Sequence, residues 1–171
     1  MKEAIPTISR MTLGYEEIAD RVSMASELED GGTLSLVFTR RFLTNLVQHL
    51  IACRQQSSEL SSQSDTQSVS GESAAAAPNA PEEPVEVSHS VKGVLIASVD
   101  VALVSQHVVL DWKDREGSAV ARLFLAAPAL SAWLLAVEEC FKRGGWSQEA
   151  WLKERALPDS IVSKQAPITV H

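Results

Sequence analysis

The residues best suited to catalysis or metal binding are two cysteines and one histidine. His49 and Cys53 are four positions apart, a spacing that places both on one side of a helix. Cys140 holds the matching place in a second predicted helix, so a pseudo-twofold packing of the helices would bring the three side chains together. A fourth ligand with suitable spacing is missing, and small buried cysteines are common in protein cores. We therefore predict no metal, no cofactor and no catalytic residue, and retain a thiol- or metal-dependent site at His49, Cys53 and Cys140 as a second alternative.

The other histidines and the common sequence motifs add no catalytic signature. His89, His107 and His171 are isolated, and no serine or carboxylate spacing forms a triad or an acid–base pair with them. The patterns GxGxxG, GxxxxGK[ST], HExxH and the EF-hand loop are missing from the sequence. The sequence thus favours a protein that is not an enzyme.

Three arginines form a candidate binding group. Arg40 and Arg41 stand at the N-terminus of the first predicted helix, where the helix dipole disfavours cations. Exposed helix amides beside two guanidinium groups suit a phosphate or the carboxylates of a partner. Arg21 joins them if the second and third predicted strands pair. Ion pairing with nearby acids such as Asp20 or Glu27 is the simpler interpretation, because surface ion pairs are common and contribute little energy.

The tryptophans all fall in the last third of the chain. Core packing accounts for Trp133 and for Trp112, which lie in strongly apolar segments. Trp146 and Trp151 follow the second long helix, outside these segments. We predict them as a docking patch and group them with Arg21, Arg40 and Arg41 as partner-binding residues.

The residue pattern of the first part predicts three strands and a helix. Apolar and polar residues alternate over 8–15, 20–27 and 33–38, and the glycines at 31–32 suit a hairpin turn. Thr39 is a plausible N-cap for a helix over 40–54, whose apolar residues recur at spacings of three and four. The same order of elements is predicted later in the chain. It consists of a nearly continuous apolar run over 91–104, strands over 107–112 and 120–125, and a helix that begins at Pro128 and ends at Gly144-Gly145.

Offsetting the chain by 87 positions aligns the two parts. The offset places Leu36 on Leu123 and Leu43 on Leu130. Two amphipathic segments can also align by patterning alone, so a true internal duplication stays open. The predicted fold class is α+β, with antiparallel sheet from two β-β-β-α halves, a possible pseudo-twofold, and two main amphipathic helices.

Composition divides the chain into four parts. The first half is 1–54, and 55–86 is rich in Ser, Ala, Gln, Glu and Pro, which predicts a disordered linker. The second half is 87–157 and contains a short helix over 148–155. The tail, 158–171, is apolar enough to add a strand to a sheet edge of its own chain or of a partner.

Charge and terminal sequence restrict the function. A net charge of −7 disfavours a broad phosphate-binding surface. No secretory signal and no apolar run of membrane-spanning length are visible, so we expect a cytoplasmic protein with no membrane partner. We predict a non-catalytic adaptor or assembly factor that binds another protein through a sheet edge, the tryptophan patch or the tail; a homo-oligomer stays open.

The alternative function is single-stranded nucleic-acid binding through Arg10, Arg21, Arg40 and Arg41. The predicted sheet-and-helix repeats resemble, in general plan, those of single-strand binders of the PUR-alpha and Whirly type. Those proteins have four strands per repeat and basic or aromatic sheet faces. This chain has three predicted strands per half and is acidic.

Overall fold

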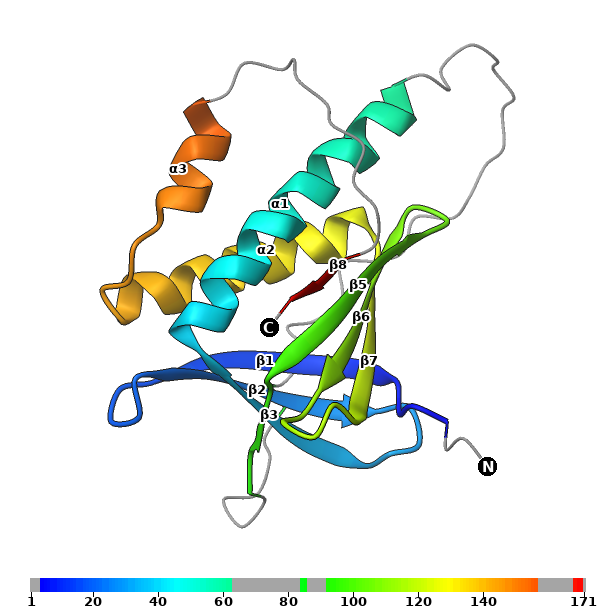
Figure 1. Cartoon of the computed structure of the whole chain (residues 1–171), viewed down its shortest axis with the longest axis vertical. Coiled ribbons are helices and arrows are strands. Elements are labelled where there is room, and N and C mark those ends of the chain that lie inside the picture. Colours follow the sequence, from blue (N-terminus) through cyan, green and yellow to red (C-terminus); the bar gives the residue numbers. More distant parts are fainter. Residues whose placement is uncertain (1–3, 63–83, 86–91, 157–167, 171) are drawn as a thin grey trace.

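The structure is a computed structural model that describes residues 4–62, 84–85, 92–156 and 168–170 (Figure 1). Its described elements form two sheets and three helices, which is the α+β class that the sequence predicts. The strand order is β1-β2-β3-β4 in the first sheet and β7-β6-β5-β8 in the second. Helices α1 and α2 cross one another and lie against the sheets (Figure 1).

The first half folds as three antiparallel strands followed by a helix. The elements are β1 (Ile8–Glu16), β2 (Arg21–Leu28), β3 (Thr33–Thr39) and α1 (Arg40–Ser62). Alternation along β2 and β3 turns one set of side chains inward, where Met24 and Leu36 are fully buried. Thr39 caps α1 as predicted, since its Oγ1 accepts a hydrogen bond from the Phe42 N–H at 3.3 Å.

The second half repeats this order. Its elements are β5 (Ser98–Val104), β6 (His107–Lys113), β7 (Ala119–Leu125) and α2 (Ala127–Arg143), followed by α3 (Glu149–Ala156). The offset of 87 also matches buried helix positions in pairs: Leu43 and Leu130, Leu46 and Trp133, Val47 and Leu134, and Leu50 and Val137. Two β-β-β-α-like halves are thus present, while their origin by duplication stays a prediction.

Each half lends a short segment to the sheet of the other. Strand β4 (Val94–Leu95) precedes β5 in the chain, yet it pairs in parallel with β3 of the first half. In the same way Thr7, just before β1, forms a parallel bridge with Arg122 on β7. The apolar run over 91–104 therefore does not form one long strand, because the chain passes from the first sheet to the second between Leu95 and Ser98.

The C-terminal segment adds a strand to the second sheet. Strand β8 (Ile168–Val170) pairs antiparallel with β5, with Thr169 opposite Asp100 (Figure 1). The tail thus pairs with an edge of its own chain, one of the two outcomes that its apolar composition predicts.

The end of α2 is fixed by a Schellman motif. The Trp146 N–H donates to the Phe141 carbonyl at 2.8 Å, and the Gly145 N–H donates to the Lys142 carbonyl at 3.1 Å. Gly145 has a φ of 63°, which confirms the left-handed stop predicted from the glycine pair. The chain folds back here, and the Trp146 ring meets the Phe141 ring edge to face at 5.0 Å.

Helix α1 is longer than the sequence pattern suggested. It continues to Ser62, so residues 55–62 of the predicted linker are helical. The rest of the predicted linker, apart from Pro84 and Val85, lies outside the described residues, and so does most of the predicted tail. The domain boundaries themselves stay a prediction. No helix in the described part of the chain is long and apolar enough to cross a membrane.

Candidate functional site

The arginine group lies where β2, β3 and α1 meet. Arg21 opens β2 and stands opposite Thr39, the last residue of β3, so the pairing of these strands brings it close to Arg40 and Arg41. All three side chains are exposed. Within the described ranges, none of them has a carboxylate within ion-pairing distance. The three residues are thus neighbours along the backbone, and the described residues do not show the local ion pairs of the simpler interpretation.

The two acids proposed as partners are engaged elsewhere. Glu27 pairs with Arg10 at 3.2 Å, across the β1–β2 ladder. Asp20 Oδ1 accepts hydrogen bonds from the Tyr15 hydroxyl at 2.7 Å and from Trp146 Nε1 at 2.8 Å. These hydrogen bonds, that of Tyr15 first, hold the pKa of the Asp20 carboxyl below its usual value, and the charge of Arg40 adds to the effect.

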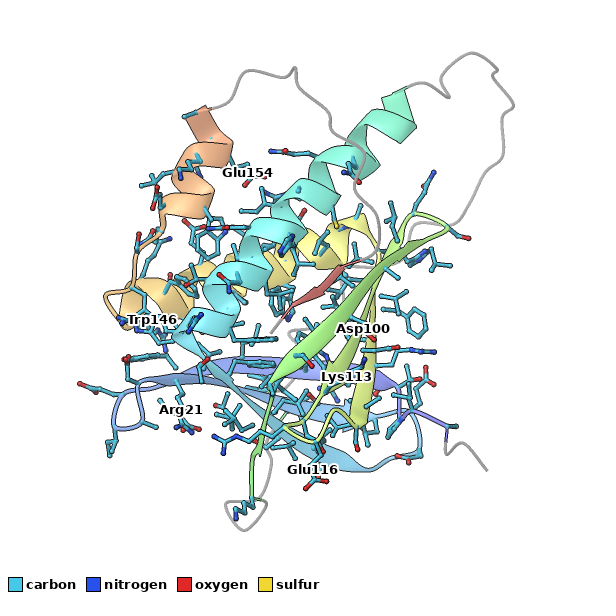
Figure 2. All side chains as sticks on the ribbon, viewed as in Figure 1. Arg21, Asp100, Lys113, Glu116, Trp146 and Glu154 are labelled. Carbon is cyan, nitrogen blue, oxygen red and sulfur yellow. The ribbon has the colours of Figure 1, made fainter. Side chains whose placement is uncertain are left out.

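Trp146 and Trp151 are buried by the chain itself. Their exposed fractions are 4% and 2%, and both rings meet Phe141 edge to face at 5.0 Å. Figure 2 shows Trp146 on the helix side of the first sheet and Arg21 on the opposite side. The two rings thus form no exposed patch, because both pack on Phe141 and Trp146 also contacts Tyr15 and Asp20 beside the β1–β2 turn. Their burial gives no support to a docking role.

The two thiols show no sign of activation. Burial raises the pKa of Cys53 and of Cys140, which is opposite to the change that a reactive thiolate requires. Among the described residues, no group of three histidine, cysteine or acidic side chains is arranged to hold a metal ion. The geometry offers nothing that would place His49 in such a site.

A surface that the sequence interpretation missed lies on the outer face of the second sheet. The outward-facing residues are apolar at one end: Ala102 on β5 faces Val109 on β6, and Val109, which is only 8% exposed, faces Phe124 on β7. Val104 extends this end, and we call the four residues the apolar row. Phe124 is 48% exposed and Val104 is 54% exposed, values that are high for large apolar side chains on strands.

The charges beside the apolar row are already neutralised. Arg122 binds Asp111 through two hydrogen bonds of 2.6 Å, and Lys113 lies 2.5 Å from Asp100 (Figure 2). The bond to Asp111 raises the pKa of Arg122. Because each cation has a carboxylate on the neighbouring strand, this face offers an apolar surface with little net charge.

The sequence contained only a weak signal for the apolar row. Strand β7 is apolar on both faces, so alternation does not show that Phe124 points away from the core. Its orientation follows from the register with β6, which is a tertiary feature.

Comparison with known proteins yields no relative for this chain: no family model, no curated protein and no solved structure matches it. The candidate site therefore depends on its own geometry.

Proposed function

We propose that this protein is a non-catalytic adaptor or assembly factor that binds another protein through the apolar row on the second sheet. The observation that carries the proposal is the exposure of Phe124 and Val104 beside side chains whose charges are paired. Burial of apolar surface is the main source of affinity between proteins, and aromatic residues are enriched at the centres of interfaces.

The electrostatics of this face favour a protein partner over a nucleic acid. Binding to a nucleic acid needs protein cations that can neutralise its phosphates and displace the counterions condensed on them, and Arg122 and Lys113 are already paired with carboxylates. A partner with an apolar contact residue gains from Phe124 without breaking these ion pairs. As part of the same proposal we place the protein in the cytoplasm, a reducing compartment that suits cysteines such as Cys53 and Cys140, which form no disulfide in the structure.

Affinity purification of the full chain from host lysate tests the proposal, with and without nuclease and with mass spectrometry as readout. We expect a partner that survives nuclease and is lost with Phe124→Ser. Leu152→Ser is the matched control, since Leu152 is an apolar side chain on α3 that is 61% exposed. Recovery that vanishes with nuclease, or that is equal for both variants, would contradict the proposal.

The second candidate function is single-stranded nucleic-acid binding through the arginine group. Its support is the exposure of Arg21, Arg40 and Arg41 and their lack of ion pairs within the described ranges. Three phosphate contacts predict that log affinity falls with log salt with a slope of about −2.

Titration of a labelled single-stranded oligonucleotide at several salt concentrations tests this candidate. Arg40→Gln together with Arg41→Gln should remove most of the slope. Arg143→Gln should not, because Arg143 pairs with Glu139 at 3.8 Å. Binding that is insensitive to salt, or no binding at low salt, rules this candidate out.

A further inference from the structure

The free edges of β1 and β5 are equivalent positions in the two halves. Each strand is the first of its three-stranded unit, and its other edge pairs with the second strand: Leu13 faces Met24 as Val101 faces Leu110. The free edge of β5 is occupied by β8, which aligns Ile168 with Val101 and Val170 with Val99. Within the described residues, no strand pairs with the corresponding edge of β1.

Burial of the inward side chains follows this difference. Val99 and Val101 on β5 are 0% and 7% exposed. Met11 and Leu13 hold the equivalent places on β1, pack against the core, and are only half buried. The edge of β1 therefore carries apolar surface that an added strand would cover, in addition to unpaired main-chain groups.

The side chains of the two edges alternate in the same way. On β5 the polar Asp100 points outward between two inward valines, and on β1 Thr12 points outward between Met11 and Leu13. A segment that fits one edge therefore presents its apolar side chains to the correct face of the other.

We propose that the edge of β1 from Met11 to Tyr15 is a docking site for an extended segment of a partner protein, bound by strand addition. The chain has one C-terminal tail and two equivalent edges, and its own β8 is paired with β5. Among the described residues no other segment of the chain pairs with this edge, so we assign it to a partner. Strand β8 indicates the chemistry of the occupant: alternating β-branched apolar and small polar residues, as in Ile168-Thr169-Val170, with no proline in the paired part. This inference deepens the proposed adaptor function and rests on it for the existence of a protein partner.

One hydrogen bond from another part of the chain reaches a side chain on the outer face of β1. The Val85 N–H donates to Thr12 Oγ1 at 2.8 Å, so a main-chain amide from a distant part of the chain reaches the Thr12 side chain. This contact engages the hydroxyl, and outside the β1–β2 ladder the described residues make no main-chain hydrogen bond to residues 11–15.

The test uses the full chain and a synthetic peptide with the sequence of residues 165–171. Titration of the labelled peptide measures binding, and hydrogen exchange read by mass spectrometry locates it. We expect 1:1 binding, with slower amide exchange in 9–16 and no change in 98–104. Absence of binding at millimolar peptide overturns the proposal. Protection in 98–104 also overturns it, because the peptide would then have replaced β8 on β5.

A charge substitution on β1 sharpens the test. Leu13→Lys places an inward-pointing charge at the edge, which natural proteins use to block strand addition, and it should weaken peptide binding at least tenfold. Leu135→Lys is the matched control, because Leu135 is 60% exposed on α2, and it should bind as the unmodified chain does. Thermal unfolding checks that both variants fold. If Leu13→Lys does not, the exchange map of the unmodified chain decides alone.

The apolar row separates this inference from the proposed function. Phe124→Ser should bind the peptide normally, since Phe124 is on the outer face of the other sheet. If the peptide fails to bind while capture of a partner still depends on Phe124, the β1 site is wrong and the adaptor function stands. If peptide binding is confirmed and no partner depends on Phe124, the apolar row is wrong and the edge remains.

Discussion

The two halves share their inner faces and differ on their outer faces. Across the first sheet, the row that corresponds to the apolar row is Gly14, Ser23 and Val37, and across the second it is Ala102, Val109 and Phe124. Val37 is covered by the chain itself, since a Cβ added to Gly93 would lie 2.5 Å from Val37 Cγ2. Phe124 has no such cover and is 48% exposed.

This difference separates what builds the fold from what is left for a partner. Apart from Ser26 on β2, the inward strand positions of both halves are mainly apolar, because both halves must contribute to one core. Outward positions are free to diverge, and the first sheet uses small residues where its own chain approaches closely. The edges show the reverse distribution: β5 is paired with β8, and no described strand pairs with the corresponding edge of β1. The first half thus has the edge of β1, and the second half has the apolar row. These are the two surfaces to which we assign binding.

The largest effect that we expect concerns a buried acid present in only one helix. Glu138 on α2 is 2% exposed at the position where α1 has Ile51, and Arg155 of α3 donates to both of its carboxylate oxygens at 2.8 Å. Arg155→Met leaves the buried carboxylate with only Lys142, at 3.8 Å. We expect a loss of about 2–3 kcal/mol in the free energy of unfolding, measured by chemical denaturation.

A double variant serves as the control for this prediction. Glu138→Ile makes α2 resemble α1 and removes the charge that Arg155 neutralises. Combined with Arg155→Met, it should cost less than Arg155→Met alone, because no unpaired buried charge is left. If the double variant is the less stable of the two, the helices differ for a reason other than charge.

The cover over Val37 gives the next largest effect. Gly93→Ala should cost about 2 kcal/mol, because the new methyl group meets Val37 Cγ2, which belongs to a stiff β-branched side chain. In a Val37→Ala background the same substitution should cost clearly less. Chemical denaturation of the four proteins gives the coupling, and additive costs would show that Gly93 does not cover Val37.

Local sequence patterns were sufficient to predict most of the elements. Alternation and turn glycines predict β2 and β3, and the stripe that ends at Gly144-Gly145 predicts α2. These features depend on interactions between near neighbours in the chain, so they are visible in the sequence. The extension of α1 to Ser62 was missed because residues 55–62 have no apolar stripe.

Features that depend on distant contacts could not be predicted. The split of the run over 91–104 depends on β4 pairing with β3, which lies more than fifty residues earlier. The sequence predicts Trp146 as part of a docking patch because it follows a helix stop, yet Trp146 packs on Phe141, binds Asp20 of the β1–β2 turn and is 4% exposed. The exposure of Phe124 could not be predicted, because β7 carries apolar residues on both faces. The candidate binding surfaces are thus the part of the molecule that the sequence predicted least well.

The turn between the first two strands also differs between the halves. In the second half, where it joins β5 to β6, a substitution should increase the stability of the fold. Ser105 and Gln106 form a two-residue loop with φ of 47° and 67°, a conformation that favours Asn-Gly. Replacing the pair by Asn-Gly should stabilise the fold by about 1 kcal/mol, because side chains other than Asn resist positive φ. Thermal unfolding measures the change. An unchanged or lower midpoint would show that the loop is not strained.

In the first half, the turn between β1 and β2 is connected to Trp146, just past α2, through the carboxylate of Asp20. This connection predicts that stability depends on pH. Hydrogen bonds from Tyr15 and Trp146 depress the pKa of Asp20 below its ordinary value of 3.8. The ionised form is therefore favoured by folding, so its contribution is fully present above pH 3.8 and is lost as the pH falls through the lower folded value. Asp20→Asn keeps an acceptor oxygen and tolerates the φ of 47°, but it cannot titrate. Unfolding midpoints of the two proteins should thus converge as the pH is lowered below 3.8. A constant difference between them would mean that the tie depends on hydrogen-bond geometry and not on the charge of Asp20.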